Sequence, residues 1–231
     1  MLGDEIGRGS YGPVYKGLDV EKGDFVAIKQ VSLENIAPED LDAIMVCGEW
    51  LTCKDHQARQ IRGPFPESLA AIYIAQVHCC PLISPLGVVH RDIKGANILT
   101  TKEGLVKLAD FGLPMKLTVS DGNAQSVTGT PYWMAPEVIE MSGVSAASDI
   151  WSVGCTVIEL ITGVPPHYDL QPMQALVQIV QDENPPMPDN LSPGITDFLL
   201  QCFKKDAKLR PDAKTLLAHP WIQDSRRAVQ R

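Results

Sequence analysis

The sequence predicts an α+β protein with two lobes, a small β-rich front and a mainly α-helical back. Short apolar runs and turn signals fill the N-terminal part, whereas helical segments separated by proline-rich breaks fill the C-terminal part. No repeat, low-complexity segment or linker interrupts the 231 residues. This length suits one domain, or two lobes that share an interface, with a sizeable core.

The front is expected to consist of strands. Residues 5–6 lead into a glycine-rich stretch. The runs 14–17 and 25–29 alternate or run apolar on either side of the turn signal at residues 21–24. These features predict a small antiparallel sheet.

The middle of the chain is less regular. A helix is expected to start at residues 40–45, but residues 46–62 show neither a helical nor a strand period. A second helix is predicted over residues 67–77, and Pro81 and Pro85 prevent it from continuing.

Beyond residue 90 the pattern becomes orderly. Strands are predicted at residues 98–99 and 106–108, and a polar loop then extends to about residue 136. Five helices are expected after it, over residues 136–141, 147–162, 174–182, 195–203 and 212–218.

The composition argues against several classes of protein. A net charge of -8 and a pI near 5.1 disfavour a non-specific binder of nucleic acid or membrane surfaces. The N-terminus lacks the basic start and apolar run of a signal peptide. The longest apolar stretch, residues 153–164, is too short to span a bilayer and contains Glu159. A cytoplasmic protein without a membrane span is therefore expected.

The six cysteines are expected to be free thiols in that compartment. A zinc site is an alternative for the residues of two short stretches, Cys53, His56, His78, Cys79 and Cys80. Because these residues lack familiar zinc-finger spacing, zinc is disfavoured.

A glycine-rich stretch carries the first chemical signal. Residues 7–14 match G-x-G-x-x-G-x-V, and glycines let a backbone approach phosphate groups closely. Any glycine-rich hairpin could show this pattern, but a dinucleotide site is disfavoured because no helix follows. Lys29 ends the next apolar strand. It could be an ordinary strand-end lysine, but after such a hairpin it is better interpreted as an ammonium group aimed at phosphate oxygens.

The decisive pattern is HRDIKGAN at residues 90–97, followed by DFG at 110–112 and APE at 135–137. In these residues the chain resembles protein kinases, because H-R-D-x-K-x-x-N, D-F-G and A-P-E occur in the family's order. The resemblance implies the two-lobe kinase fold, with an incomplete N-lobe, and phosphoryl transfer from ATP. That chemistry needs positioned charges more than covalent catalysis.

The resemblance also implies roles for individual residues. Asp92 would accept the proton of the substrate hydroxyl, and Lys94 would steady the transferred phosphoryl group. Asn97 and Asp110 would hold Mg²⁺, and Lys29 would pair with the α- and β-phosphates. The implied ATP site is formed by Ile6, Gly7, Arg8, Gly9, Ser10, Tyr11, Gly12, Pro13, Val14, Ala27 and Lys29.

Further sequence features indicate the kind of kinase. Lys94 and the segment GTPYWMAPE at residues 129–137 resemble serine/threonine kinases, and in particular MAP kinase kinase kinases and their sterile-type relatives. The runs VAIKQVSLENI and KGANILTTKEGLVKLADFG are similar to plant epsilon-type members, which implies a downstream kinase as the protein substrate. The implied domain comprises residues 1–222, as a truncated N-lobe (1–62) and a C-lobe (63–222), with a tail at 223–231.

Other residues receive structural or regulatory roles from the same resemblance. Glu137 is expected to pair with Arg210, and Asp149 is expected to brace the catalytic loop. Candidate phosphorylation sites lie between DFG and APE, with Arg91 as a phosphate partner, although plain solvated hydroxyls are an alternative; these candidates are Ser126, Thr128 and Thr130.

The N-lobe departs from the family pattern. From Lys29 to His90 the chain advances only 61 positions, which leaves roughly thirty to forty residues unaccounted for on typical element lengths. The helix position that should carry a glutamate falls on Cys47, and Glu49 lies about 200° further around that helix. The stretches 46–62 and 78–86 look like translated non-coding sequence or an altered splice junction.

Two interpretations remain open from the sequence. The chain is an ATP- and Mg²⁺-dependent serine/threonine kinase, or it is a catalytically impaired docking module or an unstable product of a mis-spliced gene. The sequence does not indicate an oligomeric state.

Overall fold

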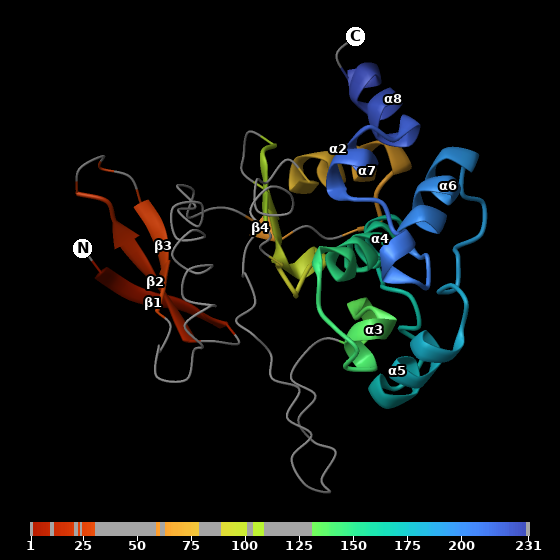
Figure 1. The fold of residues 1–231 in the computed structure, drawn as a ribbon. Helices are drawn as coiled ribbons and strands as arrows, with labels where there is room; N and C mark the ends of the chain where they lie inside the picture. The colour runs from red at the N-terminus through yellow and green to blue at the C-terminus, as the bar shows by residue number, and fades with distance from the viewer. Residues whose placement is uncertain are drawn as a thin grey trace, which may run out of the picture.

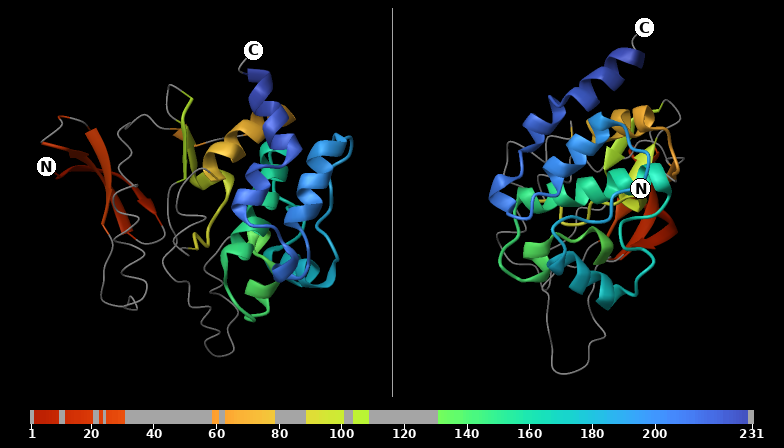
Figure 2. Two further views of the ribbon diagram at one scale, coloured as in Figure 1. Left: turned by 45° about the horizontal axis from the view of Figure 1, so that its top comes forward. Right: turned by 90° about the vertical axis from the view of Figure 1, so that its right-hand side faces the viewer.

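The computed structural model describes residues 2–9, 12–20, 23, 25–30, 59–60, 63–78, 89–100, 104–108 and 131–229. A small N-terminal sheet lies at one end of the molecule and a helical body at the other (Figure 1). Two further views show the same separation (Figure 2). This architecture confirms the predicted α+β class.

The N-terminal sheet contains β1 (Leu2–Gly9), β2 (Gly12–Leu18) and β3 (Phe25–Lys29), in the order β1-β2-β3. Both pairs are antiparallel; Gly9 faces Gly12, and Val14 faces Lys29. The strands predicted at residues 14–17 and 25–29 are thus confirmed. A glycine is required at position 12, because its φ is 143° and a Cβ there would lie 2.1 Å from the carbonyl oxygen of Gln30.

A second, smaller sheet lies against the helical body. It contains β4 (Arg59–Gln60), β5 (Ile98–Thr100) and β6 (Val106–Leu108), paired antiparallel in that order. The strands predicted at residues 98–99 and 106–108 correspond to β5 and β6. The strand β4 lies in the stretch for which the sequence showed no period, and it aligns Arg59 with Thr100.

The helices match the prediction within two residues wherever the structure describes them. The helices α5 and α6 begin two residues before their predicted starts, each at a proline. Proline fits the first helical position because it lacks an N–H group. The helix α8 lies beyond the predicted helices. The helices of the described ranges are α2 (Glu67–His78), α3 (Pro136–Ile139), α4 (Ala146–Thr162), α5 (Pro172–Gln181), α6 (Pro193–Cys202), α7 (Ala213–Leu217) and α8 (Pro220–Val229). Short 3₁₀ turns accompany them, η2 (Gly95–Asn97), η3 (Pro131–Trp133) and η4 (Ala207–Leu209).

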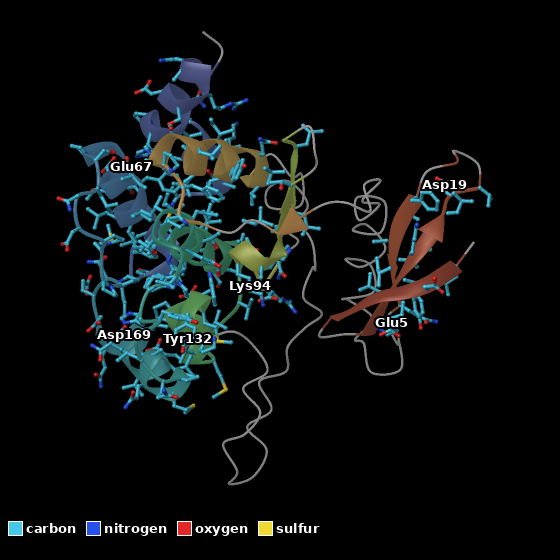
Figure 3. The ribbon with its side chains drawn as sticks, turned by 180° about the vertical axis from the view of Figure 1, so that it is seen from behind. Glu5, Asp19, Glu67, Lys94, Tyr132 and Asp169 are labelled. Carbon is cyan, nitrogen blue, oxygen red and sulfur yellow. The ribbon has the colours of Figure 1, made fainter. Side chains whose placement is uncertain are left out.

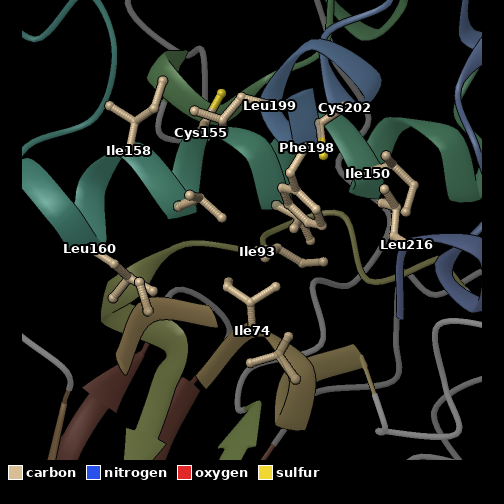
Figure 4. Close-up of a cluster of buried hydrophobic side chains, with 14 of the residues drawn as sticks. Ile74, Ile93, Ile150, Cys155, Ile158, Leu160, Phe198, Leu199, Cys202 and Leu216 are labelled. Atoms are coloured by element: carbon tan, nitrogen blue, oxygen red, sulfur yellow. The ribbon is translucent and has the colours of Figure 1, made fainter. Parts of the chain in front are cut away.

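The hydrophobic core is centred on α4, which packs against α2 and α6 (Figure 4). The rings of Trp151 and Phe203 meet edge to face, with centroids 5.1 Å apart. The helix ends at Gly163, whose left-handed φ of 90° suits a glycine. The largest side chains that are fully buried in this core are Trp151, Phe198, Phe203, Ile74, Ile93, Ile98, Ile150, Leu160, Ile195, Leu199 and Leu216.

The N-terminal sheet contributes nothing to that core among the described residues. Every residue of the core cluster lies at position 70 or beyond. In the sheet, Leu2 is 58% exposed and Phe25 is 42% exposed. A three-stranded sheet needs a second layer against one face to bury its apolar side chains, and the described residues do not supply one.

Several expectations fall outside the described residues, including the helix start at 40–45 and Cys53, His56, Cys79 and Cys80. Within the described part, Cys155 and Cys202 are free and buried. No group of three or more His, Cys, Asp or Glu side chains in that part could hold a metal ion. None of its helices is both long enough and apolar enough to cross a bilayer.

Candidate active site

The catalytic-loop residues form one hydrogen-bonded group. The loop reaches η2 and then β5, so that Asp92, Lys94 and Asn97 lie within six positions of one another. The Asn97 side-chain nitrogen donates to Asp92 Oδ2 (2.8 Å) and to the Asp92 carbonyl (2.7 Å). The Lys94 ammonium lies 2.9 Å from the same Oδ2. Two donors of different kinds therefore fix the orientation of the Asp92 carboxylate.

This group is partly open to solvent. Lys94 lies on the flank of the helical body that faces the N-terminal sheet (Figure 3). The Asp92 and Lys94 side chains are 27% and 18% exposed. The pair is thus partly shielded from water and still accessible, which would suit a general base.

The beginning of the loop is anchored to α4 by Asp149. Its carboxylate accepts the backbone N–H groups of His90 (2.6 Å) and Arg91 (2.9 Å). Arg91 adopts a left-handed φ of 71°, which is uncommon for a residue with a side chain. Burial raises the pKa of Asp149 to about 6, although the two N–H donors and the charge of Arg91 oppose the shift. Asp149 thus holds the beginning of the catalytic loop against α4.

Glu159 is a second anchor from α4, and the sequence did not single it out as a site residue. Its Oε2 accepts the backbone N–H of Gly95 (2.8 Å) and the indole N–H of Trp133 (2.9 Å). Burial raises its pKa, and these two donors and Lys94 oppose the rise. A signal was present, because a glutamate inside an apolar predicted helix needs partners when it is buried.

A bidentate ion pair joins Glu137, in α3, to Arg210, which follows η4. Arg210 donates to both carboxylate oxygens of Glu137, at 2.7 and 2.8 Å. It also donates to the carbonyls of Ala147 and Lys204 (both 2.8 Å). Burial alone would raise the pKa of Glu137, but the hydrogen bonds and charge of Arg210, with help from Ser148, lower it below its usual value. The predicted partners are thus brought together.

The nucleotide-binding residues are less completely placed. The structure gives the backbone of Lys29 at the end of β3, opposite Val14 in β2. Ile6 is 54% exposed, and Pro13, Val14 and Ala27 are half-buried. Predicted residues that lie outside the described ranges are Ser10, Tyr11, Asp110, Ser126, Thr128 and Thr130.

The donor set of the loop fits Mg²⁺ at one position. The Asn97 nitrogen makes both hydrogen bonds to Asp92, so the amide oxygen is the atom that would serve as a ligand. Amide and carboxylate oxygens suit this hard cation. Among the described residues, Asn97 is therefore the one that would hold the metal.

Comparisons with known proteins agree with this geometry. The profile of the protein kinase domain matches residues 39–222. Two plant relatives, both named MAP3K epsilon protein kinase 1, are 64% identical (Arabidopsis thaliana) and 63% identical (Brassica napus), each over the whole chain. Cytokinesis protein sepH of Emericella nidulans is 48% identical over 99% of the chain. The chain spans about a fifth of the length of these curated relatives, 19%, 20% and 19% respectively.

The same comparisons bear on the length of the chain. The match to the Arabidopsis thaliana relative extends over 262 positions, whereas this chain has 231 residues. At least 31 of the aligned positions are therefore filled by no residue of this chain. This deficit agrees with the thirty to forty residues that the distance from Lys29 to His90 leaves unaccounted for.

Proposed function

Because this chain belongs to the protein kinase domain family, and by its relatives to the serine/threonine kinases, we propose that it transfers the γ-phosphoryl group of ATP to a protein hydroxyl. The observation that carries the proposal is the fixed carboxylate of Asp92, held by the Asn97 amide and the Lys94 ammonium.

The proposed roles follow from that arrangement. The Asp92 carboxylate accepts the proton of a serine or threonine hydroxyl as the oxygen attacks phosphorus. Lys94, beside it, places positive charge next to the transferred phosphoryl group. Asp149 and Glu159 hold the two ends of the loop, so that little reorganisation is needed during transfer.

The nucleotide is proposed to bind between the glycine-rich turn and the catalytic loop. Gly7, Gly9 and Gly12 let the β1–β2 turn approach the phosphates, and Lys29 pairs with them. Asn97 and Asp110 would hold Mg²⁺, which neutralises phosphate charge when it is bound.

The relatives' names support a position in a signalling cascade. We propose that the chain acts in the cytoplasm at the MAP kinase kinase kinase level, with a downstream kinase as its protein substrate. Phosphorylation at Ser126, Thr128 or Thr130, with Arg91 as the partner of the phosphate, would regulate it.

Substitution of the proposed base tests the proposal. With Mg-ATP and a protein substrate, Asp92→Asn should lower the rate about 10²- to 10⁴-fold, because the amide cannot accept the proton. Asp189→Asn, on an exposed loop, is the matched control and should keep the rate. If Asp92→Asn retains the wild-type rate, the assignment of the base is wrong.

A second candidate function is a docking module without catalysis. The deficit of at least 31 positions and the absence of described sheet residues from the core favour it. Nucleotide binding discriminates between the candidates, because a ligand that binds only the folded state raises Tm. A kinase should show a higher Tm at millimolar Mg-ATP than with Mg²⁺ alone, whereas an unchanged Tm would favour docking.

A further inference from the structure

Ser192 makes an unusual contact for a residue at the start of a helix. It precedes α6, yet its side chain does not cap that helix. The hydroxyl donates instead to Glu67 Oε2 (2.5 Å), and the backbone N–H donates to Glu67 Oε1 (2.9 Å). One carboxylate at the start of α2 thus accepts both donors of a serine 125 positions away. We call these two hydrogen bonds the Glu67–Ser192 clamp.

The clamp lies at the surface. Ser192 is half-buried and Pro193 is exposed, at the end of an irregular connection between α5 and α6. The backbone of Ser192 is extended, with φ of -65° and ψ of 154°. Its peptide therefore already has the shape in which protein kinases bind substrate segments. Among the described residues, this is the only serine or threonine followed by proline.

We propose that Ser192 is a phosphorylation site for a protein kinase that selects proline after the acceptor, and that the phosphate opens the Glu67–Ser192 clamp. In the transfer, the Ser192 oxygen bonds to the γ-phosphorus of ATP while the bond to the β-phosphate oxygen breaks. ADP leaves, and the hydroxyl proton goes to the catalytic carboxylate of the modifying kinase.

Electrostatics determines the direction of the effect. A phosphate carries close to two negative charges at neutral pH and has no donor to offer Glu67. It would replace a charge-assisted hydrogen bond by a like-charge contact with the carboxylate. The positive end of α6 would attract the phosphate, but the phosphate removes the hydroxyl donor and places like charge directly beside the Glu67 carboxylate. The clamp is therefore expected to open.

The opening would reach the catalytic loop through the core. The helix α2 buries Ala70, Ala71 and Ile74 and packs against α4. The helix α4 carries Asp149 and Glu159, the two anchors of the loop. A looser α2 would thus weaken the support of α4 without contact with the active site.

The modification is tested in the Asp92→Asn background, which silences any activity of the chain itself. The folded chain is incubated with a purified proline-directed kinase and Mg-ATP, and the sites are mapped by mass spectrometry. Phosphate at Ser192 is expected, and Ser192→Ala should lose it. If a peptide of residues 187–197 accepts phosphate at Ser192 but the folded chain does not, the proposal is overturned.

The effect on the clamp is tested by thermal unfolding. Phosphorylation at Ser192 should lower Tm by about 5 °C in a chain of this size. Glu67→Gln is the matched variant, because its amide can donate to the phosphate; phosphorylation should lower its Tm by less than half as much. An unchanged Tm after phosphorylation, or an equal decrease in Glu67→Gln, would contradict the opening of the clamp.

Discussion

The helical body and the N-terminal sheet contain different residues of the proposed active site. The two regions differ in how many apolar side chains they bury. The body holds Asp92, Lys94 and Asn97 on a loop that is anchored to the buried helix α4. The sheet holds the glycine-rich turn and Lys29, yet no described residue of its strands enters the core. The proposed base is thus supported by a packed interior, whereas the proposed phosphate-binding elements are held mainly by strand pairing.

The difference has a physical cause in the length of the chain. In the family fold, the N-terminal sheet is completed by further strands and covered by a helix. The 61 positions from Lys29 to His90 are fewer than these elements need on typical lengths, and the match to the plant relative leaves at least 31 positions unfilled. Both numbers favour an N-lobe that lacks part of them. Hydrogen bonds between three strands contribute little net stability without burial of apolar surface. If the chain lacks these elements, the proposed nucleotide binding should weaken before the catalytic loop is affected.

The largest contrast is expected from two phenylalanines. Phe198 is fully buried, whereas Phe25 is 42% exposed and lies under the Lys16 ammonium. Phe198→Ala should lower the free energy of unfolding by about 3–5 kcal/mol, because it opens a cavity. Phe25→Ala should cost less than about 1 kcal/mol. Urea unfolding followed by tryptophan fluorescence measures both. Equal losses would mean that the sheet is as well packed as the body.

The ion pair at the end of the body gives the next effect. Arg210→Ala removes both Arg210 donors from the Glu137 carboxylate, which keeps only the Ser148 hydroxyl among the described donors, so a loss of about 3 kcal/mol is expected. The carbonyls of Ala147, Lys204 and Lys205 lose this donor as well. The matched control is Arg227→Ala, since Arg227 pairs with Asp224 at 3.4 Å and both side chains are exposed. It should cost less than about 0.5 kcal/mol in the same urea titration. A loss of that small size for Arg210→Ala would contradict a structural role for the pair.

The sequence predicted the helices better than it predicted contacts between distant residues, for identifiable reasons. Helix periods and prolines are local signals, and they placed α4, α5 and α6 within two residues. The pairing of β4 with β5 depends on a partner far along the chain, so no local period could reveal it. Glu159 was missed because its partners, Gly95 and Trp133, come together only in the fold. The roles of the site residues stay predictions until activity is measured.

A pH dependence is expected from the body alone. Burial raises the pKa of Asp149 from 3.8 to about 6, so the folded state binds a proton more tightly than the unfolded state. The resulting stabilisation is fully present below pH 3.8 and is lost as pH rises through 6. Between pH 4 and pH 6 the loss should be about 2 kcal/mol.

Urea titrations of the wild type and Asp149→Asn across this pH range measure that contribution. The variant should show the smaller decrease, because the amide that replaces the carboxyl group keeps one charge state throughout. Glu137, whose pKa is lowered, acts in the opposite sense and is common to both proteins. If the two proteins lose the same free energy between pH 4 and pH 6, Asp149 does not titrate in this range.

The smallest effect should remain within the sheet. Gly12→Ala forces a Cβ to within 2.1 Å of the Gln30 carbonyl at a φ of 143°, so the β1–β2 turn must distort, at about 1–2 kcal/mol. Gly7→Ala is the matched control in the same strand pair, because its Cβ would meet nothing within 4 Å. Hydrogen exchange should show about tenfold or greater loss of amide protection in β2 and β3 for Gly12→Ala only.

Hydrogen exchange at the amides of α4 shows whether the N-terminal sheet and the helical body unfold separately. If the sheet is an independent, weakly supported unit, Gly12→Ala should leave the protection of α4 unchanged, since the core around Trp151 and Phe198 contains no described sheet residue. Loss of protection in α4 as well would show that the two regions unfold together. The proposed nucleotide-binding elements would then be as stable as the helical body. In that case the exposure of the sheet's apolar side chains would not indicate a loss of nucleotide binding.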